Sequence, residues 1–156
     1  DKINENISCA EASHLWDHLT FRYDNKRETK TYLNLAHDRE FKSLLHKGLK
    51  ILDHQINILE KECKKFGITL PKKPAEVIGI PENTEIYNDD QMFRLITTGL
   101  QGATTLHVKS LKQCSHNDRI RKLFKDMLIK EINYYEKLIK YGKFKGWLNP
   151  APRYKV

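Results

Sequence analysis

Hydrophobic residues three and four positions apart dominate two long parts of the chain, and a proline-rich stretch separates them. Residues 67–87 form this stretch, and its prolines, Pro71, Pro74 and Pro81, exclude a regular helix because proline lacks an N–H and biases the preceding residue towards an extended backbone. On each side, the periodicity is typical of two long amphipathic helices joined by a short turn. The pattern therefore predicts a helix pair, a long connection and a second helix pair.

Capping signals set the ends of the predicted helices. Ser8 and Glu11 form a capping box in front of the first helix, and Gly67 is well placed to end the second. The middle of the first helix, residues 22–30, is strongly polar, and we expect it to fray or bend. The four helices are predicted over about residues 9–35, 37–66, 88–114 and 117–141, followed by a C-terminal arm, residues 142–156, that packs back across the end of the bundle.

Short, long and short connections predict a single all-α domain over residues 1–156, a four-helix bundle. The connection 67–87 is long enough to run the length of the bundle, since an extended chain covers about 3.3 Å per residue. This favours a ferritin-like arrangement, with a crossover between the second and third helices, in which the third helix begins at the end where the first one finishes. An up-down-up-down bundle is the alternative.

Composition narrows the class of protein. Charged residues make up 31% of the chain and hydrophobic residues 39%, and no apolar run reaches the roughly 18 residues of a membrane span. No signal-peptide pattern is present either, so we expect a cytoplasmic location. The formal net charge is +8, but the lysines are spread over all four helices without interleaved aromatic residues, and specific nucleic-acid binding is not expected. Binding to polyanions through the basic surface is the weakest functional hypothesis.

The three cysteines, Cys9, Cys63 and Cys114, are odd in number and form no C-x-x-C pair. This usage is typical of free thiols in a reducing compartment. The crossover arrangement would bring all three to one end of the bundle, where a disulfide or a thiolate site is the alternative.

Several polar residues interrupt the apolar stripes of the predicted helices. A buried carboxylate or imidazole needs a partner or a metal ion, and bundles build di-iron and di-manganese centres from such groups on facing helices. The sequence therefore indicates a candidate site for iron, manganese or zinc, with His14 and Gln55 as neighbours. Its candidate ligands are Glu11, His18, His107 and Glu131.

Two features of this set favour a mononuclear or degenerate site over a full di-iron centre. The Glu-x-x-His spacing that such centres repeat on two helices occurs only at Glu11–His14. Counting residues along straight helices also leaves Glu131 about two turns from the other candidates. The alternatives are that Glu11 serves only the capping box, and that His107 and Glu131 are core groups hydrogen-bonded to each other or to neighbours. No phosphate loop, nucleophile elbow or His-Glu-x-x-His motif is present, so we expect a protein that is not an enzyme.

Three segments of the chain resemble one family. They are the opening Ile-Ser-Cys-Ala-Glu-Ala-Ser-His-Leu-Trp of residues 7–16, the Gly67-x-x-x-Pro71 exit from the second helix, and the ending with Gly146, Pro150 and Pro152. Together they resemble an uncharacterised family of ferritin-like bundles from spore-forming bacteria, described as similar to spore coat protein F. The resemblance implies a four-helix fold and a link to sporulation, and with it association with the spore as the alternative to a cytoplasmic location.

The resemblance also bears on the metal hypothesis. The family's glutamate near the start of the first helix matches Glu11, whereas a histidine expected late in the second helix falls at Gln55, next to His54. The chain thus departs from the family's pattern at one candidate ligand.

Two functional hypotheses follow. The first is a non-catalytic bundle protein acting in sporulation or coat assembly, with protein partners or self-association through the Trp147–Tyr154 arm and exposed aromatics such as Tyr32 and Tyr134. The second is a ferritin-like metal-binding protein or oxidoreductase with its site inside the bundle.

Overall fold

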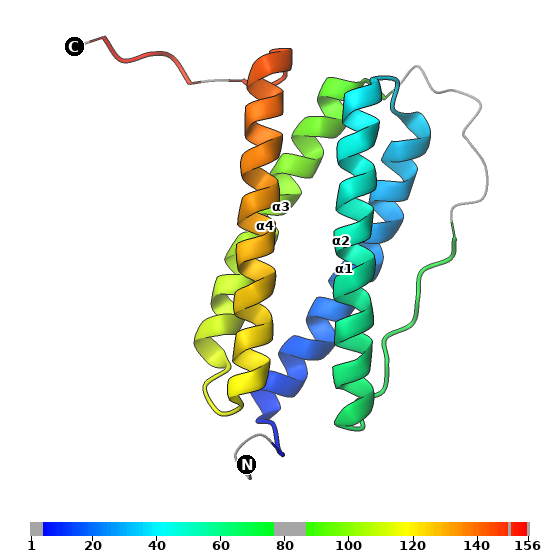
Figure 1. Cartoon of the computed structure of the whole chain (residues 1–156), viewed down its shortest axis with the longest axis vertical. Helices are drawn as coiled ribbons and strands as arrows, with labels where there is room; N and C mark the ends of the chain where they lie inside the picture. Colours follow the sequence, from blue (N-terminus) through cyan, green and yellow to red (C-terminus); the bar gives the residue numbers. More distant parts are fainter. Residues whose placement is uncertain (1–4, 77–86, 150, 156) are drawn as a thin grey trace.

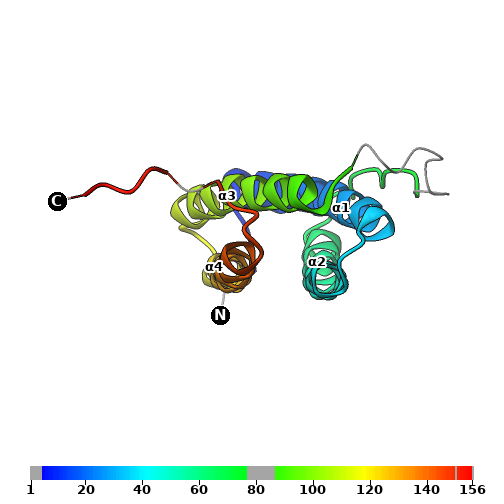
Figure 2. The same cartoon turned by 90° about the horizontal axis from the view of Figure 1, so that it is seen from above.

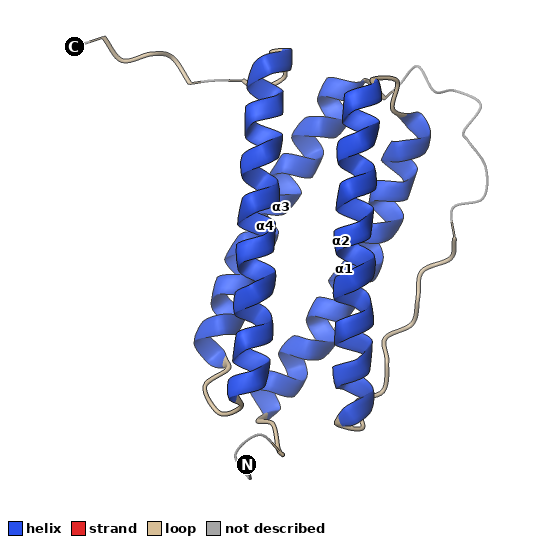
Figure 3. Ribbon diagram, viewed as in Figure 1, coloured by secondary structure: helices blue, strands red, loops and turns tan. Residues whose placement is uncertain are grey.

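The computed structural model describes residues 5–76, 87–149 and 151–155, and these contain four helices and no strand (Figure 3). The helices are α1 (Cys9–Leu35), α2 (Arg39–Lys65), α3 (Asp89–Gln113) and α4 (Asp118–Lys145). The predicted all-α four-helix bundle is therefore confirmed. The predicted connection lies partly outside the described residues, since 77–86 are not among them.

The helix ends follow the predicted capping signals. The Ser8 hydroxyl accepts a hydrogen bond from the Glu11 N–H at 3.1 Å, and the Glu11 carboxylate accepts one from the Ser8 N–H at 2.8 Å, which completes the capping box. Gly67, just after α2, and Gly146, at the end of α4, both have positive φ angles, a conformation that favours glycine. The last helix continues beyond residue 141 to Lys145, because Gly142 remains helical and only Gly146 turns the chain.

The polar middle of α1 does not fray, so the fraying expected for residues 22–30 was wrong. It is helical throughout, and side chains across the α1–α2 interface hold it. The Tyr23 hydroxyl donates to Glu60 at 2.6 Å, and Lys26 Nζ lies 2.6 Å from the Asp53 carboxylate. Polar residues here bridge to α2 instead of competing with the helix.

The connectivity is the predicted crossover arrangement. In Figure 1, α1 and α4 run in one direction, while α2 and α3 run in the opposite direction. The start of α3 therefore meets the end of α1, where the Asp89 carboxylate accepts hydrogen bonds from the N–H groups of His37 at 2.9 Å and Asp38 at 2.6 Å. An up-down-up-down bundle would place Asp89 at the other end of the molecule.

The helices pack as two pairs. The α1–α2 and α3–α4 pairs are closely packed, whereas the contacts between pairs are sparse. Seen from above, α1 and α3 form one layer and α2 and α4 the other (Figure 2). One buried cluster contains Leu15, Leu19, Leu59 and Phe124, and a second contains Phe41, Phe93 and Leu138. Polar side chains near the middle of α1 and α4 lie between the pairs.

The C-terminal arm differs from its prediction. Trp147 packs against Phe41, Phe93 and Tyr141, with ring centroids 5.5–5.8 Å apart, and closes the end of the bundle. Residues 151–155 instead extend away from the helices (Figure 1), and Tyr154 is 91% exposed. Apart from Tyr154, this stretch offers little apolar surface to bury, since its other residues are Ala151, Pro152, Arg153 and Lys155.

Two aromatic residues predicted to be exposed are not. Tyr32 is buried, and its hydroxyl donates to Glu28 at 2.7 Å. Tyr134 is half-buried and donates to the Leu44 carbonyl at 2.8 Å. Both rings contribute to the space between the helix pairs, so they are not available as an outer contact surface.

Replacing Gly142 with alanine is expected to lower the free energy of unfolding by about 1–3 kcal/mol, because α4 there touches a fully packed core. A Cβ atom would lie 2.6 Å from Cε1 of Phe93, closer still to Cζ of that ring, and 3.0 Å from Cγ of Leu148. In the control, Gly102→Ala, the added atom meets nothing within 4 Å, and we expect a gain of up to about 1 kcal/mol from helix propensity. Urea unfolding followed by circular dichroism measures both, and equal effects would contradict the close packing.

Candidate functional site

Three buried side chains from three helices form the centre of the polar core. Arg22 on α1 donates from Nη2 to Nε2 of His107 on α3 at 2.6 Å, and the same Nη2 lies 3.5 Å from Oε1 of Glu131 on α4. Nδ1 of His107 contacts Oε2 of Glu131. A guanidinium can only donate, so Nε2 of His107 must be the acceptor and its ring proton resides on Nδ1, facing the carboxylate. We call Arg22, His107 and Glu131 the central triad.

A chain of polar groups continues from the central triad towards the start of α1. The ring of His18 lies 4.8 Å from that of His107, centroid to centroid, and its Nδ1 donates to the His14 carbonyl at 2.8 Å. Ser110 Oγ lies 3.0 Å from Nδ1 of His14 and 3.4 Å from Nε2 of His18. Burial, and then the neighbouring His107, lowers the pKa of His18 to about 3, so His18 is neutral at neutral pH.

Glu11 belongs to a different part of the molecule. Besides the Ser8 N–H, its carboxylate accepts hydrogen bonds from the N–H groups of His116 at 2.9 Å and Asn117 at 2.7 Å, just before α4 begins. Burial alone would raise the pKa of Glu11, but these three backbone hydrogen bonds more than offset that effect and lower it. Glu11 is therefore an ionised group that joins the starts of α1 and α4.

The structure thus brings together three of the four predicted ligands, His18, His107 and Glu131, and separates Glu11 from them. The predicted two-turn misfit of Glu131 is wrong, since its carboxylate contacts His107. The alternative reading of His107 and Glu131 as mutually bonded core groups fits the geometry.

These residues do not fit a metal ion in this arrangement. The guanidinium of Arg22 lies against both His107 and Glu131, where a cation would have to bind. Among the described residues, no three His, Cys, Asp or Glu side chains are grouped so that they could hold a metal ion. The metal site remains a prediction from the sequence, which metal analysis of the chain purified without chelator would test.

The sequence predictions missed Arg22 and Ser110. Arg22 follows Leu15 and Leu19 along the buried stripe of α1, so its spacing indicated a buried position. Because it is charged, however, it was assigned to the polar middle of the helix. Ser110 lies one turn beyond His107 on α3 and donates to the Leu106 carbonyl at 3.0 Å. A serine at such a position has no distinctive spacing.

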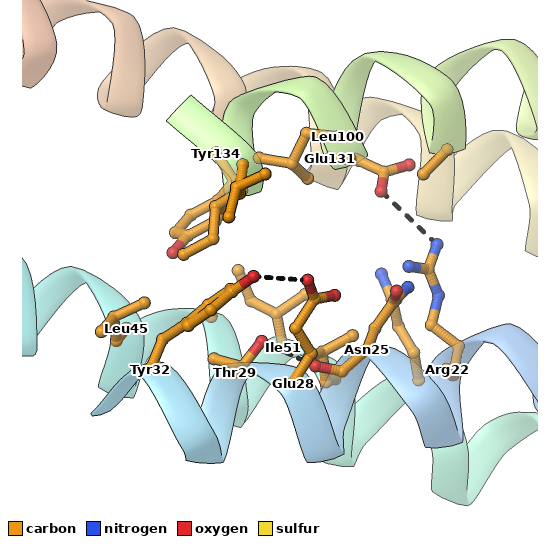
Figure 4. Close-up of a pocket in the computed structure, with 17 residues that line it drawn as sticks. Arg22, Asn25, Glu28, Thr29, Tyr32, Leu45, Ile51, Leu100, Glu131 and Tyr134 are labelled. Carbon is orange, nitrogen blue, oxygen red and sulfur yellow. Dashed lines mark hydrogen bonds and ion pairs between the residues drawn. The ribbon is translucent and has the colours of Figure 1, made fainter. Parts of the chain in front are cut away.

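A cavity of about 120 Å³ lies beside the central triad, between the two helix pairs. Figure 4 shows Tyr32 and Glu28 facing Leu100 and Tyr134 across it, with Arg22 and Glu131 towards one end. All four helices contribute to its lining, and Gln55 is among the lining residues.

The two buried cysteines are not thiolates. All three are free thiols, and Cys63 and Cys114 are buried in the same core cluster. Burial is the main cause that raises the pKa of Cys63 to about 11 and that of Cys114 to about 12, so both are neutral thiols rather than thiolates at neutral pH.

The fold and the polar core together define the class of protein. It is an all-α four-helix bundle with one crossover and a buried Arg–His–Glu network. No described helix is both long and apolar enough to cross a membrane. Residues 1–156 match the model of a family described as "Protein of unknown function (DUF3231)", and the chain belongs to this family. The family resemblance drawn from the sequence is confirmed.

Two solved structures share the fold. One is the crystal structure of a Bacillus halodurans protein provisionally described as a spore coat protein, with a TM-score of 0.88, 18% identity and coverage of 96% of each chain. The other is a DUF305 fragment from Deinococcus radiodurans, with a TM-score of 0.70, 13% identity and coverage of 87% of this chain and 97% of that one. No curated protein matches the sequence.

Proposed function

We propose that this chain is a non-catalytic helical-bundle protein that acts in sporulation, in the spore coat or in its assembly. The observation that carries the proposal is the fold shared with the Bacillus halodurans protein provisionally described as a spore coat protein, which extends over 96% of both chains.

The polar core supports a structural role for the bundle. The functional groups of Arg22, His107 and Glu131 contact one another, and each of these residues is buried. Buried polar groups that pair with one another across helices fix the packing of those helices and are shielded from solvent. A protein built in this way is suited to being a component of an assembly.

The surface for assembly would lie near the C-terminal end of α4. Phe144 is 79% exposed on the last turn of the helix, and Tyr154 projects from the extended arm. Large aromatic residues exposed in this way are enriched where proteins contact one another. We therefore propose that protein partners, or a second copy of the chain, bind this end.

The test is the location of the full chain, fused to a fluorescent protein, in a sporulating Bacillus host. The fusion is expected to concentrate around the developing spore and to be recovered in the extracted coat fraction. Phe144→Ser should reduce this recovery, whereas Phe21→Ser, which alters an exposed ring on α1, should not. A uniform distribution of the wild-type fusion throughout sporulation, with none in the coat fraction, would refute the proposal.

A further inference from the structure

The cavity between the helix pairs has the features of a ligand site. Protein interiors contain few voids larger than a water molecule, whereas this one measures about 120 Å³. Its walls are largely apolar, formed by Leu45, Ile51, Leu100 and the rings of Tyr32 and Tyr134 (Figure 4). An apolar chamber with a few polar groups at one end is the usual construction of a small-molecule site.

Two polar groups that line the cavity lack partners among the described residues. Nε of Arg22 is buried without a hydrogen-bond acceptor. Gln55 is only 4% exposed, and its side-chain amide makes no hydrogen bond to any described residue. The Lys26–Asp53 and Tyr23–Glu60 bridges lie on either side of Gln55 along α2, so Gln55 faces the part of α1 that directly follows Arg22, and both residues line the cavity. A buried guanidinium N–H is normally satisfied, and a ligand oxygen at this end would satisfy Nε of Arg22 and would also be available to the Gln55 amide.

The cavity is accessible between α1 and α3, which pack sparsely against each other. Three of its lining residues on these two helices are exposed: Glu28, Leu95 and Gly99. A Cβ atom added to Gly99 would meet nothing within 4 Å, so the absence of a side chain there leaves the entrance open.

Charge and size define the kind of ligand. Arg22 is the one cation among the described lining residues, and Glu131 already neutralises it, while Glu28 adds a negative charge at the entrance. An anionic ligand is therefore disfavoured, and a charged amine would lose its hydration in a largely apolar chamber. Cavities of roughly 150 Å³ hold benzene, so this cavity of about 120 Å³, which is open at its entrance, suits a ligand of roughly five to seven non-hydrogen atoms.

We propose that this cavity binds a small uncharged molecule with an apolar body and one hydroxyl or carbonyl group, of about the size of phenol. Its oxygen would accept a hydrogen bond from Nε of Arg22 and bond to the amide of Gln55, and its apolar body would contact Leu45, Leu100 and Tyr134. This inference does not depend on the proposed role in the spore coat.

The test compares phenol with toluene, which has the same number of non-hydrogen atoms but no hydroxyl group. Each is titrated into the ¹⁵N-labelled full chain, and the amide shifts are followed by NMR. Both are expected to give saturable shifts around the cavity, with phenol binding roughly three- to tenfold more tightly because it makes the additional hydrogen bond. Absence of saturable binding by both compounds would overturn the proposal.

Two comparisons between variants and their controls test whether the ligand binds in this cavity. Gly99→Leu fills the entrance and should abolish the shifts. Gly102→Leu changes another exposed glycine of α3, about one turn away and outside the cavity lining, and this variant should bind like the wild type. Gln55→Met conserves the side-chain volume, removes the amide, and should bring the affinity for phenol close to that for toluene. Equal binding by the wild type and Gly99→Leu, or equal loss in both leucine variants, would contradict the assigned site.

Discussion

Replacing Glu131 with alanine is expected to lower the free energy of unfolding by about 3–5 kcal/mol, the largest single effect that the structure indicates. The carboxylate is the only anion in the central triad, and both it and Arg22 are almost fully buried. Without Glu131 the guanidinium would remain in the core as an uncompensated charge, and Nδ1 of His107 would lose the carboxylate that it contacts. Urea unfolding of the wild type and Glu131→Ala at neutral pH measures the difference.

A matched variant distinguishes the loss of stability caused by breaking the triad from the net contribution of the intact triad to the free energy of unfolding. Replacing all three members with apolar residues, as Arg22→Met, His107→Leu and Glu131→Leu, removes the buried charges together with their desolvation penalty. We expect this triple variant to lie within about 2 kcal/mol of the wild type, or to exceed it. A loss as large as that of Glu131→Ala alone would instead mean that the intact network stabilises the fold.

Replacing Glu11 with alanine is expected to cost about 3 kcal/mol or more, because three backbone N–H groups lose a charged acceptor. Two of these groups precede α4 and the third belongs to the cap of α1, so the substitution loosens two helix starts at once. Ser8→Ala, which removes only the reciprocal cap bond of the same box, should cost about 1 kcal/mol. Similar losses in the two variants would show that the bonds to α4 contribute little.

The same carboxylate makes stability depend on pH. Its pKa is lowered in the folded chain from an ordinary value of 4.5, so the folded state releases this proton more readily than the unfolded state. The stabilisation is therefore complete above about pH 4.5 and is lost as the pH falls through the lower, folded-state pKa. Acidification from about pH 6 to about pH 3 should consequently destabilise the wild type more than Glu11→Ala, and parallel pH profiles would contradict this.

The sequence predicted the features that depend on local patterns, but not those that depend on how the helices cross. Periodic apolar positions and the prolines between them predicted the four helices and the crossover, because helix faces and chain breaks are local properties. The predicted position of Glu131, about two turns along the bundle from the other candidate ligands, was wrong. Counting residues along straight helices ignores the inclination of one helix to another, which Figure 1 shows for α3 against α4. The contact with His107 depends on how two helices cross, and no local pattern records that angle.

The polar core shows a second limit of sequence reasoning. His18, His107 and Glu131 were predicted to converge because each interrupts an apolar stripe, and they do lie together. The partner that balances them, Arg22, stands on a stripe too, but a long charged side chain is far more often at the surface. The cavity could not be predicted from the sequence, because it exists only where the two helix pairs pack sparsely against each other.

The carboxylates of Glu11 and Asp89 have a consequence for how the chain selects its connectivity. Parallel helices bring their positive N-terminal dipole ends together, α1 with α4 at one end of the bundle and α2 with α3 at the other. One carboxylate bridges each pair of N-termini: Glu11 holds the start of α4, and Asp89 holds the N–H groups that lead into α2. In an up-down-up-down bundle, α1 and α4 would start at opposite ends, as would α2 and α3, and both carboxylates would lose these partners. These two carboxylates therefore favour the observed order of helix directions over the up-down-up-down order, which the apolar pattern alone leaves open.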